Sequence, residues 1–591
     1  MRRLLGIAVS GLLLVALLPV AAAADGHGAC GDSFTPIYEI QGDGEDSPLD
    51  GAEDVVTEGI VTVDLQTSSQ LSGFFIQARR GDGNAATSDG IFVNHRDTWS
   101  PSFNPSVGDL VRVRGEVDEQ FGNTQIEFLT DGEVCRSGFR PNPSTVDART
   151  YTANAESYEG MFLRIPGQLA VTDTFNQHRF GEVWLAEATV VEQPTNEFPV
   201  GADAEALAAD NMARSFLLDD SSTSSDPRPV PYFHSGGTLR LGDTVGGVTG
   251  AVNYSFGQYR INPQNPSSVV FKQTNPRPPA PPVRGDVTVV SFNVLNYWTT
   301  LGGRGATTTD QLEVQTEKLV DAMTAMNADI IGLQEVENDP SHAPVTALVD
   351  AMNAEAGADV WSWMGEVDHY NVYPIRNEII YRNDRVSPVG GPVTIADPIF
   401  DEIPEGRVDP LGRPPVAQTF AYGADVFTVV NNHFKSKSCS GATGADDDQD
   451  DGQACWNPTR VAQAERVLQF VNDLVADTGD ADVLVLGDLN SYLDEDPVLT
   501  MEGQLVNLVR AFDPNPYSFN FFASFSAPWI GRGLLDYAFA TPSMVTQVRS
   551  TQIWHANADE PRVLDWFDPT ITAPNGYRSS DHDPVVVGLD F

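Results

Sequence analysis

Short apolar runs rich in β-branched residues recur through the second half of this chain, and polar side chains stand where the runs end or begin. Runs of this kind predict buried strands. The polar positions are Asn293, Glu335, His433, Asp488, Asn490, Asp536, Asp581 and His582. Because active sites of layered α/β folds collect at strand ends, the pattern predicts such a domain with one polar site along a sheet edge.

Segments with helical periodicity lie between these runs. One segment carries Leu312, Leu319, Met323 and Met326, and another carries apolar residues at helical spacing over 461–475. At the start of the second segment we predict Asn457 as the N-cap and Pro458 as the first helical residue. Alternation of strands with helices supports a layered α/β core.

An internal repeat precedes this half of the chain. It aligns Gly115, Val117, Phe121, Gly122 and Ile126 with Gly250, Val252, Phe256, Gly257 and Ile261 at identical spacing. Short alternating strands separated by Gly and Asp turns accompany each copy. The repeat therefore predicts two small all-β barrels of the OB type. Such barrels either bind a ligand through groove aromatics or act as a rigid spacer, and we favour the spacer because neither copy is basic.

A proline-rich stretch over 275–282 separates the repeat from the α/β half. Such a stretch favours extended backbone and suits a linker. We therefore expect an OB-like β domain over 25–145, a second over 146–272, a linker over 273–286 and the α/β domain over 287–591.

The N-terminus has the pattern of a secretory signal over residues 1–24. Arg2 and Arg3 precede an apolar stretch, and four alanines then provide small residues suited to cleavage. A membrane anchor is the alternative, but the apolar stretch is short for a span. We expect a secreted, extracellular protein with no membrane contact after cleavage.

The chain has four cysteines, which suits an oxidising compartment. Cys439 and Cys455 bracket one loop, which favours a local bridge, and Cys30 and Cys135 then pair by elimination. Other connectivities, free thiols and a zinc site stay open, although no C-x-x-C spacing supports zinc.

Acidic residues number 82 against 35 basic residues, giving a formal net charge of −47. A surface so acidic repels itself at low salt, and this repulsion is screened within about 3 Å at molar salt. The balance indicates adaptation to a saline exterior, with ordinary solubility as the alternative. Handling a polyanion then requires local positive charge, and Lys435, close to His433, is our candidate for contacting a substrate phosphate.

Glu335 is the first candidate for a metal ligand, because it follows a fully apolar run. Asn293 and Asp581 complete a set of oxygen ligands, which hard ions such as Mg²⁺ or Mn²⁺ prefer. The alternative for each residue is a solvated strand end. A structural Ca²⁺ is a further candidate in the acidic loop 446–451, where a solvated charge run is the more frequent outcome.

The remaining polar residues have types that suit phosphate hydrolysis. Asp488 could orient or deprotonate an attacking water, and Asn490 could donate to a phosphoryl oxygen, although a turn would explain both. His582 exchanges protons near neutral pH, and Asp536 is the carboxylate expected to orient it. His433 offers a second imidazole.

Taken in order, the segments around these residues resemble the endonuclease/exonuclease/phosphatase superfamily, which has the DNase-I-like fold. A narrower resemblance to bacterial secreted nucleases of the ExeM and NucH type is carried by residues 431–437, 452–457 and 557–561. The resemblance implies a four-layer α/β sandwich and metal-dependent phosphodiester hydrolysis. It also implies a second carboxylate paired with His433, which the strand predicted over 374–382 does not identify.

We therefore expect a secreted nuclease acting on DNA, with RNA as a further substrate. A phosphomonoesterase or a lipid-headgroup phosphodiesterase on the same fold is the alternative, since the fold does not settle the substrate. A non-catalytic binding protein is a third class, which the complete set of site residues disfavours.

Overall fold

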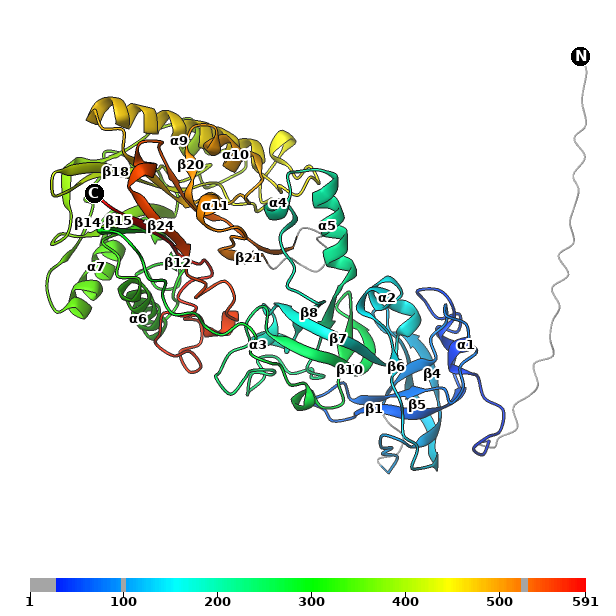
Figure 1. Cartoon of the computed structure of the whole chain (residues 1–591). Coiled ribbons are helices and arrows are strands. Elements are labelled where there is room, and N and C mark those ends of the chain that lie inside the picture. The colour runs from blue at the N-terminus through cyan, green and yellow to red at the C-terminus, as the bar shows by residue number, and fades with distance from the viewer. Residues whose placement is uncertain (1–27, 97–101, 522–529) are drawn as a thin grey trace, which may run out of the picture.

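The computed structural model describes residues 28–96, 102–521 and 530–591. The predicted signal segment 1–24 lies outside them. No helix in the described ranges is long and apolar enough to cross a membrane. Figure 1 shows three parts in chain order, with a β-rich unit between an N-terminal barrel and a larger C-terminal domain.

The first unit is a closed barrel with strand order β1-β2-β3-β5-β4. Its elements are α1 (Ile37–Gln41), β1 (Val55–Leu65), β2 (Gly73–Gln77), β3 (Gly90–Asn94), β4 (Leu110–Glu119) and β5 (Thr124–Arg136). Alternate residues of these strands, such as Val113 and Ile126, fill the interior. The expected Cys30–Cys135 disulfide joins the start of the described chain to β5.

The second unit, which we call the second β-domain, repeats this topology. Strands β7-β8-β9-β11-β10 follow the same order, and β10 pairs with β7 to complete the ring. Its elements are β6 (Ser144–Thr145), α2 (Ala148–Ala153), β7 (Phe162–Asp173), α3 (Gln177–Phe180), β8 (Val183–Glu187), α4 (Pro194–Glu197), α5 (Ala202–Ala213), β9 (Ser215–Leu218), β10 (Thr244–Ser255) and β11 (Gln258–Asn262).

The sequence repeat corresponds to matching hairpins in the two units. Val117 pairs with Ile126 in the first hairpin, and Val252 pairs with Ile261 in the second. Strand β6 pairs with β7, so Ser144 and Thr145 belong to the sheet of the second unit, whose start the sequence placed at residue 146. The stretch 275–282 packs onto the C-terminal domain, where the carbonyl of Pro278 accepts hydrogen bonds from two of its side chains.

Two six-stranded sheets form the C-terminal domain. The first has the order β14 (Trp361–Trp363), β15 (Ile375–Arg382), β13 (Ile330–Glu337), β12 (Val287–Tyr297), β25 (Val585–Leu589) and β24 (Val548–Ile553). The second has the order β16 (Ser387–Thr394), β17 (Val416–Tyr422), β18 (Asp425–His433), β19 (Val483–Asp488), β23 (Asp536–Ala540) and β20 (Val506–Asn507). A short pair, β21 (Phe519–Phe521) and β22 (Gly531–Gly533), lies beside them.

Alternation along the central strands explains the layers. Val289 of β12 points into the core shared by both sheets, whereas its neighbour Val290 packs with helices α6 and α7. Helix α9 packs on the second sheet through residues such as Val467. The helices are α6 (Thr309–Ala325), α7 (Ala343–Ala356), α8 (Pro398–Asp401), α9 (Asn457–Thr478), α10 (Asp496–Glu502) and α11 (Leu508–Phe512).

Helix α9 begins differently from our expectation. Asn457 is its first residue, and Trp456 precedes it with a left-handed φ of 66°. The capping role passes to Asp446 in the acidic loop, whose carboxylate accepts from the backbone N–H of Thr459 at 3.1 Å. The expected Cys439–Cys455 disulfide holds this loop close to the helix.

Candidate active site

Strand register places three of the expected residues in one row. His433 at the end of β18 lies opposite Asp488 of β19, and Asp488 lies opposite Asp536 of β23. Nε2 of His433 is 3.3 Å from Oδ2 of Asp488. Asn490 follows in a left-handed conformation, and its side-chain amide donates to the carbonyl of Phe434. The three strand ends therefore share one edge, as the sequence predicts.

His582 enters this row from the other sheet, just before β25. Its Nδ1 lies 2.7 Å from Oδ2 of Asp536, and its Nε2 lies 3.9 Å from Oδ2 of Asp488. Burial alone would lower the pKa of His582, but Asp536 and Asp488 outweigh it and raise the pKa well above the ordinary value. The buried imidazole thus favours its cationic form, with Nε2 directed toward Asp488.

A bulge positions Glu335. The pairing of β13 with both of its neighbours shifts at this point, and Glu335 adopts a left-handed φ of 67°. Such irregularities redirect a side chain at the cost of local strain. The backbone N–H of Asn296 donates to the Glu335 carboxylate at 2.9 Å. Nearby, the Asn293 amide donates to Asp488 at 3.1 Å, which joins this group to the row of His433, Asp488 and Asp536.

The metal ligands expected from the sequence fit a hard cation. Burial, and next to it the charge of Asp581, raise the pKa of Glu335, so these two carboxylates lie near each other. Oδ1 of Asp581 is buried and has no hydrogen-bond partner among the described residues. The unpaired oxygen of Asp581, the Glu335 carboxylate and the amide oxygen of Asn293 are ligand types that suit Mg²⁺ or Mn²⁺.

A second group of ligand atoms lies close by. Asp488, Asp536 and His582 bring one candidate ligand atom each to within 4.8 Å of the others. A cation bound there would compete with the hydrogen bond between His582 and Asp536. The Glu335–Asp581 pair and this group of three are thus two neighbouring places where the described side chains offer ligand atoms.

Positive charge borders the row on one side. Arg413, which precedes β17, is 2% exposed, and its Nε and Nη1 have no hydrogen-bond partner among the described residues. Lys435 is also buried, and its Nζ lies 5.0 Å from the ring centre of Trp456. Burial, followed by the charge of Arg413, lowers the pKa of Lys435 to about 7. Lys437 is instead bound to Glu495 at 2.7 Å, so it offers no free charge.

His433 differs from His582 in its charge state. Burial, and then Arg413 and His582, lower the pKa of His433 well below its usual value. Its Nδ1 has no partner within the described ranges. Glu378 on β15, the carboxylate within the predicted strand, forms an ion pair with Arg376 at 2.6 Å. His433 is therefore a neutral imidazole here, without the second carboxylate that the resemblance implies.

Residues 290–582 match the profile of the endonuclease/exonuclease/phosphatase family. This chain carries a domain of that family. The family unites enzymes that hydrolyse phosphate esters, and the matched residues contain every side chain of the row just described. The second β-domain matches a different profile over 142–273, which describes a domain of unknown function.

Several solved structures are similar to about half of this chain. A mannosyl-6-phosphatase from Bacteroides thetaiotaomicron is 18% identical, over 52% of this chain and 100% of its own, with a TM-score of 0.32. The human nocturnin catalytic domain with bound sulfate is 16% identical, over 52% of this chain and 96% of its own, with a TM-score of 0.32. Zebrafish TDP2 with a single-stranded DNA product is 13% identical, over 52% and 99%, at 0.33. No curated protein matches the chain.

Two residues beside the row were not predicted from the sequence. Arg413 lies three residues before β17, so an inspection of the residues that flank strands could have found it. Ser518 donates to Oδ2 of Asp536 at 2.7 Å. It lies next to the short strand β21, whose sequence has no distinctive polar pattern, so only the structure places it at the site.

The acidic loop at the predicted Ca²⁺ position uses its carboxylates locally. Asp446 caps α9, and Asp448 and Asp451 accept from backbone N–H groups two residues on. Among the described residues, the groups that could hold a metal do not include this loop.

Proposed function

We propose that the protein is a secreted, metal-dependent nuclease that hydrolyses phosphodiester bonds of extracellular DNA, with RNA as a further substrate. The observation that carries this proposal is the convergence of Glu335, Asp581 and Asp488 with the His582–Asp536 pair at one sheet edge. We assign the C-terminal domain to a four-layer α/β sandwich and the two barrels to the OB type, on the basis of the sheet order.

Asn293, Glu335 and Asp581 would hold the divalent cation. When bound, such an ion polarises the phosphate and lowers the pKa of a water molecule. Burial and the charge of Asp581 raise the pKa of Glu335, and a cation between these two carboxylates would relieve their repulsion.

The proton-handling residues lie beside these ligands. Burial raises the pKa of Asp488 to about 7, so this carboxylate can orient a water molecule and accept its proton near neutral pH. Cationic His582, fixed by Asp536, can donate a hydrogen bond or a proton to an oxygen that gains charge. Asn490 and neutral His433 provide further contacts to the phosphoryl group.

Arg413 and Lys435 supply the positive charge that a polyanion requires. In a chain with a net charge of −47, two buried cations beside the reaction centre are most simply explained by an anionic substrate. The guanidinium of Arg413 can form a bidentate contact with a phosphate, whereas Lys435 acts as a point charge.

The direct test measures plasmid degradation with Mg²⁺ or Mn²⁺, next to phosphate release from small monoesters and headgroup release from phospholipids. We expect plasmid loss that a chelator stops. Phosphate or headgroup release with intact plasmid would transfer the assignment to the alternative enzymes. Glu335→Gln should abolish hydrolysis, and Glu337→Gln is the matched control, because Glu337 lies on the same strand but binds the backbone of Thr299.

A further inference from the structure

Asn196 of the second β-domain reaches into the scaffold of Asp536. The Asn196 side chain is 5% exposed, and its amide donates to the carbonyl of Pro516 at 3.2 Å. Its oxygen accepts from the backbone N–H of Leu534 at 2.8 Å. A single side chain therefore ties together two segments of the C-terminal domain that are distant in sequence.

Both of these segments hold Asp536. Ser518 lies two residues after Pro516 and donates to Oδ2 of Asp536, the oxygen that faces His582. The Ser518 hydroxyl in turn accepts from the N–H of Leu535 and of Asp536. Because Leu534 lies two residues before Asp536, Asn196 sets the relative position of the carboxylate and its hydroxyl donor.

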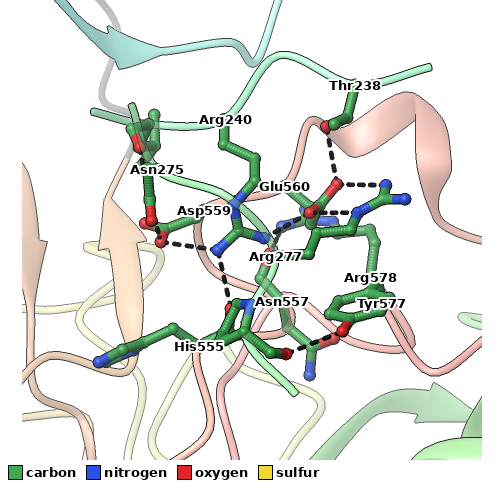
Figure 2. Close-up of polar contacts among 12 residues, drawn as sticks. Thr238, Arg240, Asn275, Arg277, His555, Asn557, Asp559, Glu560, Tyr577 and Arg578 are labelled. Carbon is green, nitrogen blue, oxygen red and sulfur yellow. Dashed lines mark hydrogen bonds and ion pairs between the residues drawn. The ribbon is translucent and has the colours of Figure 1, made fainter. Parts of the chain in front are cut away.

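A second interdomain contact, drawn in Figure 2, involves the loop beside His582, the partner of Asp536 in the His582–Asp536 pair. Arg240 of the second β-domain is fully buried, and its guanidinium contacts Asp559, Glu560 and the carbonyl of His555. Arg277 adds a forked contact to Glu560 at 2.7 and 2.8 Å. Two guanidinium groups thus balance two buried carboxylates, which is the condition for burying such charges at acceptable cost.

The loop fixed by Arg240 holds His582. Asn557, within this loop, donates its side-chain amide to the carbonyl of His582 at 2.7 Å. The N–H of Asn557 donates to the carboxylate of Asp583, the residue that follows His582. Tyr517 joins the two contact regions, since its hydroxyl donates to Asp559 and its ring stacks on His555 at 3.9 Å.

We propose that the second β-domain is part of the active site, with Asn196 and Arg240 as positioning residues that fix Asp536 and His582 against each other. The proposal assigns a role to a domain whose family profile has none, and it rests on the proposed function for the reaction concerned. Asn196 binds the backbone two residues before Asp536, and Arg240 binds the loop in which Asn557 holds the carbonyl of His582, so both buried contacts lead to members of the pair.

The test uses the full chain with Asn196→Ala, which removes both hydrogen bonds, and Asn196→Asp, which keeps the acceptor for Leu534. Arg228→Ala is the matched control: it removes another interdomain ion pair, to Asp568 at 2.7 Å, in a loop without contact to the pair. Two readouts are measured: kcat and KM on a DNA oligonucleotide, and the low-field proton NMR signal of the His582–Asp536 hydrogen bond, identified by its loss in Asp536→Ala.

We expect Asn196→Ala to lower kcat by about 10²-fold, the cost of misplacing a catalytic group by about 1 Å. KM should change little, and the low-field signal should shift or broaden. Asn196→Asp should recover part of both, and Arg228→Ala should resemble the wild type. A folded Asn196→Ala protein with the kcat of the wild type and an unchanged low-field signal would overturn the proposal. If Asn196→Ala does not fold, an Asn196→Asp protein with the kcat and the signal of the wild type would overturn it. Should the wild type hydrolyse no phosphodiester, the proposed function fails while the NMR comparison still decides this inference.

Discussion

Lys435 should make substrate capture depend on pH in a way that an arginine would not. Burial lowers its pKa to about 7, so its charge is present below pH 7 and lost above it. Arginine stays protonated throughout this range. We therefore expect Lys435→Arg to change the shape of the pH profile of kcat/KM, which reports groups of the free enzyme.

The expected size follows from two limits. With a pKa of about 7, the protonated fraction falls by about 90-fold between pH 6 and pH 9. A charged hydrogen bond to phosphate contributes about 1.5–3 kcal/mol, which corresponds to about 10- to 150-fold in kcat/KM. If the enzyme with a neutral Lys435 amine still turns over substrate, the energy of the lost hydrogen bond sets the size of the effect. We therefore expect kcat/KM of the wild type to fall by about 10- to 10²-fold between pH 6 and pH 9.

The assay measures kcat/KM for both proteins from pH 6 to pH 9 and plots the ratio of variant to wild type. Contributions of Asp488 and His582 are common to both proteins and cancel in this ratio. The ratio should rise with pH through about 7. Lys437→Arg is the control: burial lowers the pKa of Lys437 to about 8, within the range of the assay, but its ammonium is bound to Glu495, so its titration should leave substrate capture and the ratio nearly unchanged. A flat ratio for Lys435→Arg would show that Lys435 does not contact the substrate as a cation.

Three further results are expected. Burial raises the pKa of Glu378 to about 7 from an ordinary 4.5, so the unfolded chain releases this proton at lower pH than the folded chain, and the wild type should lose about 3 kcal/mol of stability between pH 4.5 and 7. In denaturant melts at pH 5 and pH 8, Glu378→Gln should lose less stability with rising pH than the wild type. An equal loss in both proteins would contradict the raised pKa. Glu335→Gln should weaken Mn²⁺ binding in calorimetry at least tenfold, and unchanged binding would place the cation elsewhere. Activity on DNA should rise when salt is added at low ionic strength, because screening acts first on the repulsion between the acidic surface and the substrate; a monotonic fall would indicate an attractive surface.

Strand ends could be found from the sequence because they depend on local patterns. His433, Asp488 and Asp536 each terminate or begin an apolar run, and the register of neighbouring strands then brings them together without further information. The repeat was equally visible, since matching hairpins need the same turn and core residues. What these positions share is that one short segment of sequence determines each of them.

Features that depend on two distant segments could not be predicted. The bulge that turns Glu335 arises from its pairing with both neighbouring strands, and nothing in the apolar run before it signals a left-handed residue. Capping of α9 by Asp446 likewise requires the disulfide-closed loop to fold back onto the helix. Asn196 and Arg240 act from another domain, so their relation to the site appears only in three dimensions.

The distribution of charge connects these observations to the choice of substrate. Most carboxylates in the part of the chain that the structure describes lie where salt can screen them, whereas Arg413 and Lys435 are buried beside the row of proposed catalytic side chains. Buried charges are screened much less than exposed ones, so the attraction near the reaction centre persists at salt concentrations that remove the long-range repulsion. A nuclease with a basic surface behaves in the opposite way, since its affinity falls steeply with salt as counterions compete. Under the proposed function, short-range recognition of one phosphate by two buried cations would let a strongly acidic protein act on a polyanion, and it would favour contact with the scissile phosphate over extended binding along the strand.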